Sequence, residues 1–162
     1  MNLFHGANKE KILVSACLMG EKCRYDGNDC LAPEIVKNIE NLVLCCPEVM
    51  GGLPTPRVPA EIIGGNADDV LDGQAQVITK AGKDVTAEFI AGAHQTLELA
   101  KENQVSIAIL KEESPSCGSC LIYDGNFTGN KIAGAGITTA LLCRHGIRVY
   151  SEENFESISE FC

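Results

Sequence analysis

Short runs of apolar residues recur along the chain, separated by longer segments in which apolar residues follow helical spacing. Four runs rich in Val, Ile and Leu are typical of buried strands: 11–16, 42–45, 105–110 and 147–150. Three segments predict helices: Pro33 to Asn41, Asp84 or Thr86 to about Asn103, and Gly136 through Cys143. Strands that alternate with helices predict an α/β protein with a mostly parallel sheet and helices on both faces.

The remaining segments predict shorter elements. Residues 47–65 contain four prolines and four glycines, and we expect them to form an ordered loop at the active site. The pattern over 70–79 predicts a small hairpin that turns at Asp72 and Gly73, and residues 121–126 predict a strand followed by a turn. A short helix is expected to begin at Ser151.

Composition narrows the class of protein. The chain has 162 residues, 45% apolar and 22% charged, as is typical of one globular domain; we place it at 11–162, after an N-terminal extension of residues 1–10. The formal net charge of −9 argues against a nucleic acid duplex as partner. We find neither a signal peptide nor a stretch that predicts a membrane span, so we expect a cytoplasmic protein whose thiols are reduced.

Nine cysteines in a reducing compartment indicate metal binding or catalysis rather than a disulfide framework. Cys17, Cys46 and Cys117 each follow a predicted strand and lie near Gly or Pro. Ligands of parallel α/β sheets bind beyond the carboxyl ends of the strands, so we expect these three thiols to form one site.

The other cysteines have less distinctive surroundings. Cys45 and Cys143 lie at apolar positions and are expected in the core. Cys120 is three residues from Cys117, a spacing seen in redox pairs and in halves of zinc sites. The roles of Cys23 and Cys30, which flank a polar loop, stay open.

Three single thiolates from three loops suit a [4Fe–4S] cluster with one iron free of protein ligands, whereas structural zinc favours four ligands in close pairs. Glu48 follows Cys46 by two residues and is a candidate acid or base. Ser114 is a candidate for proton transfer or for capping a turn. Arg24 and Arg57 are candidates for binding an anion or for a plain surface role. The N–H groups of 134–138 are a further candidate for anion binding.

Several motifs occur together in a characteristic order: Val14–Gly20, Cys23–Gly27, Cys46–Glu48, Gly51–Arg57 with Glu61, Ser114–Gly118 and Tyr123–Gly125. Through these motifs the chain resembles the thiouracil desulfidase (TudS) family over roughly residues 11–152. The resemblance implies a Rossmann-like α/β fold and a [4Fe–4S] cluster on Cys17, Cys46 and Cys117. Cys45, next to Cys46, is an alternative ligand.

The resemblance also implies an activity. A thiolated uracil compound, such as thiouracil or 4-thiouridine monophosphate, would be converted to its oxo form without net electron transfer, and hydrosulfide would be released. Glu48 and Ser114 would handle protons, and Ser15, Arg24 and Arg57 are candidate substrate contacts. The partner would be a small thiolated pyrimidine base or nucleotide. The alternatives are a zinc-binding structural or hydrolytic domain, and a sulfur or cluster carrier without desulfidase activity.

Overall fold

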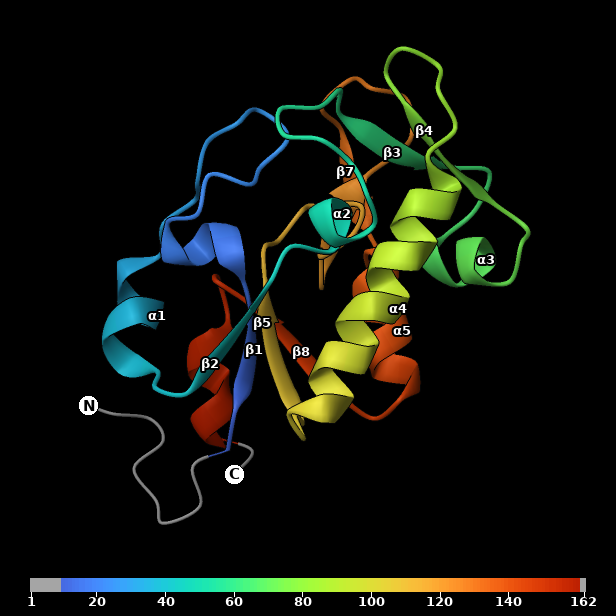
Figure 1. Cartoon of the computed structure of the whole chain (residues 1–162). Helices are drawn as coiled ribbons and strands as arrows, with labels where there is room; N and C mark the ends of the chain where they lie inside the picture. The colour runs from blue at the N-terminus through green and yellow to red at the C-terminus, as the bar shows by residue number, and fades with distance from the viewer. Residues whose placement is uncertain (1–9, 161–162) are drawn as a thin grey trace.

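A four-stranded parallel sheet forms the centre of the structure, a computed structural model that describes residues 10–160 (Figure 1). Its strands are, in spatial order, β2 (Leu42–Cys45), β1 (Ile12–Ser15), β5 (Ile107–Leu110) and β8 (Arg148–Ser151). The four apolar runs therefore form strands as predicted. Only the central strands β1 and β5 are buried along their whole length, because β2 and β8 lie at the edges of the sheet.

Helices cover both faces of this sheet. Alternate residues of the central strands point to opposite faces, so Leu13 and Ala108 pack with α4 (Thr86–Glu102) and α5 (Ile137–Arg144). Ile12 and Ile107 pack on the other face with α1 (Pro33–Asn38) and the 3₁₀ helix η2 (Phe155–Glu160). This arrangement confirms the predicted α/β fold.

The chain ends are only partly described. The predicted extension of residues 1–10 lies outside the described residues except for residue 10. The domain bounds of 11–162 stay a prediction. The C-terminal helix begins at Phe155 rather than at Ser151, because the backbone N–H of Ser151 donates to the side chain of Asn154 and forms a turn there. Within residues 10–160, no helix is long and apolar enough to cross a membrane.

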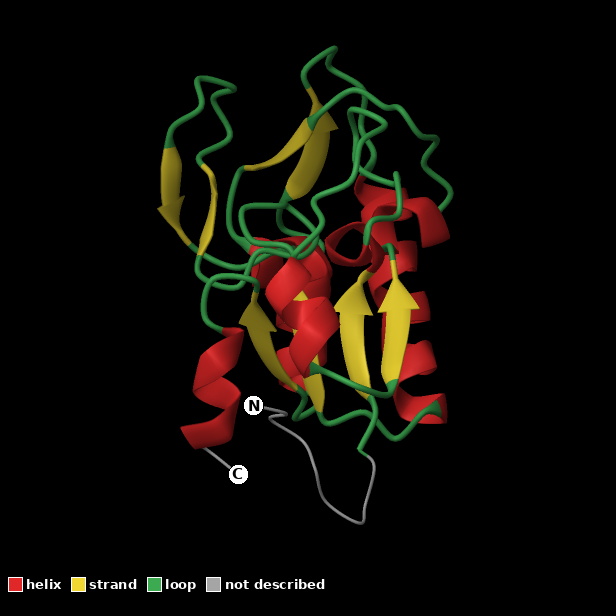
Figure 2. Ribbon diagram, turned by 90° about the vertical axis from the view of Figure 1, so that its left-hand side faces the viewer, coloured by secondary structure: helices red, strands yellow, loops and turns green. Residues whose placement is uncertain are grey.

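Two antiparallel hairpins lie beyond the carboxyl ends of the strands, at the top of Figure 2. One pairs β3 (Ala60–Ile63) with β4 (Gln76–Thr79), and the other pairs β6 (Leu121–Tyr123) with β7 (Lys131–Ala133). The segment 47–65, predicted as an ordered loop, is not a loop throughout, because it contains the short helix α2 (Pro47–Met50) and the strand β3.

The predicted hairpin within 70–79 is wrong. Residues Ala67–Leu71 form the helix α3, and β4 pairs with β3 instead. The side chain of Asn66 accepts a hydrogen bond from the N–H of Asp69 (2.9 Å), and Asp69 accepts one from the N–H of Asn66 (2.8 Å). This capping box satisfies two N–H groups at the start of a helix. Gly73 then terminates that helix with a φ of 79° rather than forming a hairpin turn.

Two glycines let α2 approach α4 backbone to backbone. A Cβ atom on Gly92 of α4 would lie 1.9 Å from the carbonyl oxygen of Pro47, and one on Gly51 would lie 1.9 Å from that of Glu88. Neither position tolerates a side chain without movement of backbone. The contact fixes α2, and with it Cys46 at the N-terminus of that helix.

We expect Gly92→Ala to lower the free energy of unfolding by about 1–3 kcal/mol, because the added methyl group overpacks the contact between α2 and α4. Alanine otherwise stabilises a helix interior by about 1 kcal/mol relative to glycine, so the sign of the effect is diagnostic. Urea unfolding measures it. Gln95→Ala, at an exposed position of the same helix, is the control and should be nearly neutral. A stabilised Gly92→Ala variant would contradict the described packing.

Candidate active site: a thiol-lined cavity at the carboxyl ends of the strands

A cavity of about 310 Å³ lies where the sheet meets the two hairpins. All eight residues singled out in the sequence line it: Ser15, Cys17, Arg24, Cys46, Glu48, Arg57, Ser114 and Cys117. They come from segments separated by up to a hundred residues. The parallel sheet brings them together, because its strands end at the same edge.

Each of the three predicted ligand cysteines lies where a strand ends. Cys17 is in the 3₁₀ helix η1 (Ala16–Met19), directly after β1, and Cys46 lies between β2 and α2. Cys117 lies in the loop between β5 and β6. Cys17 and Cys117 are buried and Cys46 is half-buried. The thiols of Cys46 and Cys117 are near enough to influence one another electrostatically.

Cys23 is a fourth thiol at this site. It makes hydrogen bonds with the thiols of both Cys17 and Cys46, and the contact with Cys17 is the largest effect that raises the pKa of Cys23 to about 11. The backbone oxygen of Cys23 also lies 3.7 Å from the sulfur of Cys46. The sequence left Cys23 without a role, because nothing local distinguished it from an exposed loop cysteine.

The other cysteines fall into two groups. Cys45 is 3% exposed and belongs to the hydrophobic core, although it also borders the cavity. Cys143 is exposed, which corrects its predicted place in the core, since it falls on the outer side of α5. Cys120 is exposed too, and neither it nor Cys30 lines the cavity.

The loop that carries Cys117 is attached to the start of α5. The carbonyl oxygens of Gly118, Pro115 and Ser116 accept hydrogen bonds from the first N–H groups of the helix region, those of residues 136, 137 and 138, at 2.8–2.9 Å. A Cβ atom on Gly136 would lie 2.3 Å from the carbonyl carbon of Ser116. The predicted use of 134–138 to bind an anion is therefore wrong, since these donors hold the cysteine loop.

Two serines complete the surroundings of Cys117. The hydroxyl oxygen of Ser114 accepts hydrogen bonds from the N–H groups of Ser116 (3.1 Å) and Cys117 (3.2 Å). Its turn-capping role is thus present, and among residues 10–160 its own hydrogen has no acceptor. The Ser15 hydroxyl accepts from the N–H of Lys111 (2.9 Å) and hydrogen-bonds with the Cys117 thiol. Burial is the main effect that raises the pKa of Cys117 to about 12, and the Ser15 contact opposes it.

Glu48 and Arg57 form an ion pair in the wall of the cavity. The Nε of Arg57 lies 3.4 Å from Oε1 of Glu48, and their side chains are 6% and 19% exposed. Burial raises the pKa of Glu48, and the charge of Arg57 opposes that rise. Arg57 also donates to the carbonyl oxygens of Cys23 (3.0 Å) and Pro54 (3.2 Å), so most of its donors already hold protein groups.

Arg24 is the more accessible of the two predicted arginines. Its guanidinium lies 3.5 Å from a carboxylate oxygen of Asp26 and 5.7 Å from the centre of the Tyr25 ring. The Arg24 side chain is 30% exposed, and both Arg24 and Tyr25 line the cavity. Arg24 can therefore reach a ligand at less cost than Arg57, because its ion pair is partly solvated.

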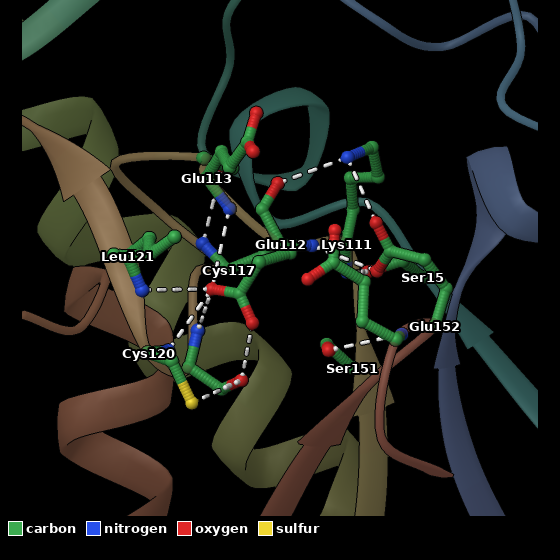
Figure 3. A network of polar contacts seen from close by, with 12 residues as sticks. Ser15, Lys111, Glu112, Glu113, Cys117, Cys120, Leu121, Ser151 and Glu152 are labelled. Carbon is green, nitrogen blue, oxygen red and sulfur yellow. Dashed lines mark hydrogen bonds and ion pairs between the residues drawn. The ribbon is translucent and has the colours of Figure 1, made fainter. Parts of the chain in front are cut away.

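Glu112 was missed by the sequence analysis and is the most heavily hydrogen-bonded side chain of the site (Figure 3). It is 2% exposed, and Oε1 accepts from the N–H groups of Ser119 (2.8 Å), Cys120 (2.9 Å) and Leu121 (3.0 Å). The Ser119 hydroxyl donates to Oε2 (2.7 Å). Burial would raise the pKa of Glu112, but these hydrogen bonds outweigh it and lower the pKa to about 2.

Neighbouring contacts fix the strand end before this loop. The ammonium of Lys111 lies 2.9 Å from Oε1 of Glu152, and Oε2 of Glu152 accepts from the N–H of Glu112 (2.9 Å), as Figure 3 shows. An acidic residue two positions after a buried strand is the only sequence signal for Glu112. That signal is weak because its partners are backbone groups, which any residue supplies.

The thiols that line the cavity are donors of the kind that an iron–sulfur cluster takes. Across residues 10–160, no three His, Cys, Asp or Glu side chains converge closely enough to hold one metal ion. A cluster distributes its thiolate bonds over several irons, so its ligands need not converge on one point. Cys17, Cys46 and Cys117 are the residues that could hold it, and binding would displace the thiol protons.

The fold and the cavity thus define an α/β protein with a candidate metal-cluster site at the carboxyl ends of its parallel strands. A family model described as 2-thiouracil desulfurase matches residues 12–154. The chain belongs to this 2-thiouracil desulfurase family.

Two relatives extend the comparison. The chain is 51% identical over 149 residues to an uncharacterized protein of Bacillus subtilis (strain 168), YbbK, covering 91% of this chain and 99% of that protein. It is also similar to the solved structure of the [4Fe-4S]-dependent thiouracil desulfidase TudS, with 46% identity and a TM-score of 0.82. That match covers 94% of this chain and 97% of the other.

We expect Glu112→Gln to lower the free energy of unfolding near neutral pH by about 2 kcal/mol, because the buried hydrogen bonds lose their charged acceptor. The folded pKa of Glu112 lies below its ordinary value of 4.5. Its stabilisation is therefore complete above pH 4.5 and is lost as the pH falls toward 2. Urea unfolding near neutral pH and at about pH 3 should show the difference between the two proteins shrinking in acid.

Glu113→Gln provides the matched control. Glu113 is adjacent in sequence, but its side chain is 26% exposed in an ion pair with Lys131. Its replacement should cost less than about 1 kcal/mol, as is usual for partly solvated ion pairs. Equal effects at the two positions, or a Glu112→Gln difference that is independent of pH, would contradict the role given to Glu112.

Proposed function

We propose that this protein is a [4Fe–4S]-dependent desulfidase that converts a thiolated uracil compound to its oxo form and releases hydrosulfide. The observation that carries the proposal is that thiols from three strand ends line one cavity together with the partly buried pair of Glu48 and Arg57. The membership of the chain in the 2-thiouracil desulfurase family, and its similarity to TudS, support the same reaction.

Cys17, Cys46 and Cys117 would hold the cluster. When bound, a cluster with three protein ligands supplies an open iron that acts as a Lewis acid toward a thiocarbonyl sulfur. The protein keeps the neighbouring thiol of Cys23 and the hydroxyl of Ser15 close to this site. The rigid attachments of the Cys117 loop to α5 and to Glu112 would fix one ligand relative to the other two.

Glu48 is suited to accept a proton from water. Burial raises its pKa, and Arg57 holds the carboxylate in place and limits the rise. Attack of water on the ring carbon replaces the C–S bond by a C–O bond, and the departing sulfur leaves as hydrosulfide without net electron transfer. Ser114 lines the same cavity and can pass a proton through its hydroxyl, whose oxygen is fixed by two backbone N–H groups.

The expected substrate is a small molecule. The cavity of about 310 Å³ is near the lower end of the usual range of small-molecule sites. Thiouracil and 4-thiouridine monophosphate are the two substrates we propose, with Arg24 as the contact for a phosphate group, because it is the accessible arginine of the cavity. The eight described cysteines are all free, which supports the cytoplasm as the location.

Anaerobic reconstitution tests the cofactor and its ligands. Cys17→Ser, Cys46→Ser and Cys117→Ser should each lose most of the bound iron and the release of sulfide from 2-thiouracil, because each removes one cluster ligand. Iron content and sulfide are measured on the same samples. Cys143→Ser, at an exposed position that does not line the cavity, should retain both.

Three results would redirect this proposal. Bound zinc without iron would favour a zinc-binding domain. A complete cluster with no sulfide released from any thiolated uracil would favour a carrier. Loss of iron in Cys45→Ser but not in Cys46→Ser would show that Cys45, rather than Cys46, is the cluster ligand.

Glu48→Gln and Ser114→Ala test the proton-handling residues. Each should lower kcat by about 100-fold or more, as is typical when a general acid or base is removed. Iron content should stay near that of the wild-type protein, because neither residue is a proposed ligand. Glu113→Gln, which removes another carboxylate of the cavity lining, is the control. An unchanged kcat in Glu48→Gln with an intact cluster would remove Glu48 from the mechanism.

A further inference from the structure

The turn between β6 and β7 is anchored to the other hairpin by one buried carboxylate. Glu61 lies on β3, where Ile62 points into the core and Glu61 points the opposite way, toward the cavity. It is 7% exposed, and its Oε1 accepts hydrogen bonds from the N–H groups of Gly125 (2.8 Å) and Phe127 (3.4 Å). One oxygen of Glu61 thus links this turn to β3.

The turn holds an aromatic residue in an unfavourable backbone conformation. Phe127 has a φ of 54°, in the left-handed region that bulky residues rarely adopt. Gly125 is also fixed, because a Cβ atom there would lie 2.7 Å from the carbonyl oxygen of Ile62. Strain of this kind persists where the surroundings enforce it and is concentrated at functional sites. Phe127 and Tyr123 both line the cavity.

The second oxygen of Glu61 is available to a ligand. Its Oε2 has no hydrogen-bond partner within residues 10–160, whereas every fully enclosed side-chain nitrogen or oxygen in that range has one. Oε2 is therefore not enclosed by protein. Since Glu61 is almost completely buried and lines the cavity, the open side of this oxygen faces the cavity. An acceptor in such a place suits a ligand that brings an N–H donor.

We propose that the Phe127 turn and Glu61 form the site that recognises the pyrimidine ring, with Oε2 of Glu61 accepting a ring N–H and the Phe127 side chain packing on the ring face. The inference rests on the proposed function and names the substrate side of the same cavity. Uracil and its thiolated forms carry ring N–H donors and a flat π-face, the two features that this pair of residues complements. A purely structural role for Glu61 would use only Oε1.

Binding of uracil separates recognition from sulfur chemistry, because uracil has the ring and its N–H groups but no sulfur. Isothermal titration calorimetry of the cluster-loaded protein under anaerobic conditions gives its Kd. Glu61→Gln can keep the turn through its amide oxygen while it presents N–H groups to the cavity. We expect about a 10-fold or greater loss of uracil affinity, since a hydrogen bond to a charged acceptor is replaced by two opposed donors.

A ligand without ring N–H groups provides a second test of the proposed recognition site. The wild-type protein should prefer uracil over 1,3-dimethyluracil, and Glu61→Gln should abolish most of this preference. Phe127→Ala should weaken uracil binding about 10-fold, and Phe127→Tyr, which keeps the ring, should restore it. Thr128→Ala, at an exposed position that does not line the cavity, is the control and should bind uracil normally.

Iron content and the free energy of unfolding of each variant exclude loss of the fold as the cause. Undetectable binding of uracil by the wild-type protein, or a preference for uracil that survives Glu61→Gln, would overturn the inference. Normal uracil binding with no sulfide released from any thiolated uracil, 4-thiouridine monophosphate included, would instead overturn the proposed function and leave the recognition site in place. The two failures are therefore distinguishable.

Discussion

The burial of the Glu112 carboxylate among backbone N–H groups is the interaction on which the geometry of the site depends. Desolvation of a carboxylate is unfavourable, and the donors of residues 119–121 supply most of the hydrogen bonds that compensate for it. Those donors belong to the chain that follows Cys117. The chain around Cys117 is held by α5, because the first N–H groups of that helix donate to the carbonyl oxygens of the loop. The loop is thus fixed on both sides of its cysteine, with little freedom left to the thiol.

Two carboxylates of the cavity lining have opposite protonation behaviour because their surroundings differ. Glu112 accepts several backbone N–H groups, which lower its pKa and keep it ionised near neutral pH. Glu48 has one ion-pair partner, Arg57, and burial raises its pKa. Such separation of environments is how one fold assigns structural and proton-transferring roles to the same chemical group. Glu112 is therefore suited to structure and Glu48 to chemistry.

The sequence predicted those parts of the structure that depend on local patterns. The apolar runs identify the strands of the parallel sheet, and the rule that ligands bind at the carboxyl ends of such strands brings Cys17, Cys46 and Cys117 to one cavity. The capping box of α3 was present in the sequence as Asn66 and Asp69, but the adjacent Asp72 and Gly73 also fit a turn. Competition between two local signals explains that error.

Contacts between distant residues could not be predicted in this way. Glu61 binds backbone groups more than sixty residues away in the sequence. Backbone donors have the same chemistry at every position, so the sequence carries no mark of which ones a carboxylate will meet. The same holds for Cys23, whose thiol reaches Cys17 and Cys46 only after the loop has folded.

The cavity has two halves with different mechanical support. Loops at the ends of the parallel strands supply the thiols, and their backbone is held by the sheet, by α5 and by the close contact of α2 with α4. The hairpins β3–β4 and β6–β7 supply Glu61, Tyr123 and Phe127, and Glu61 is the principal polar link between them. A cofactor needs ligands at fixed separations, whereas a substrate must enter and leave. The densely bonded half is therefore suited to hold a cluster, and the half anchored by one carboxylate is suited to select what reaches it.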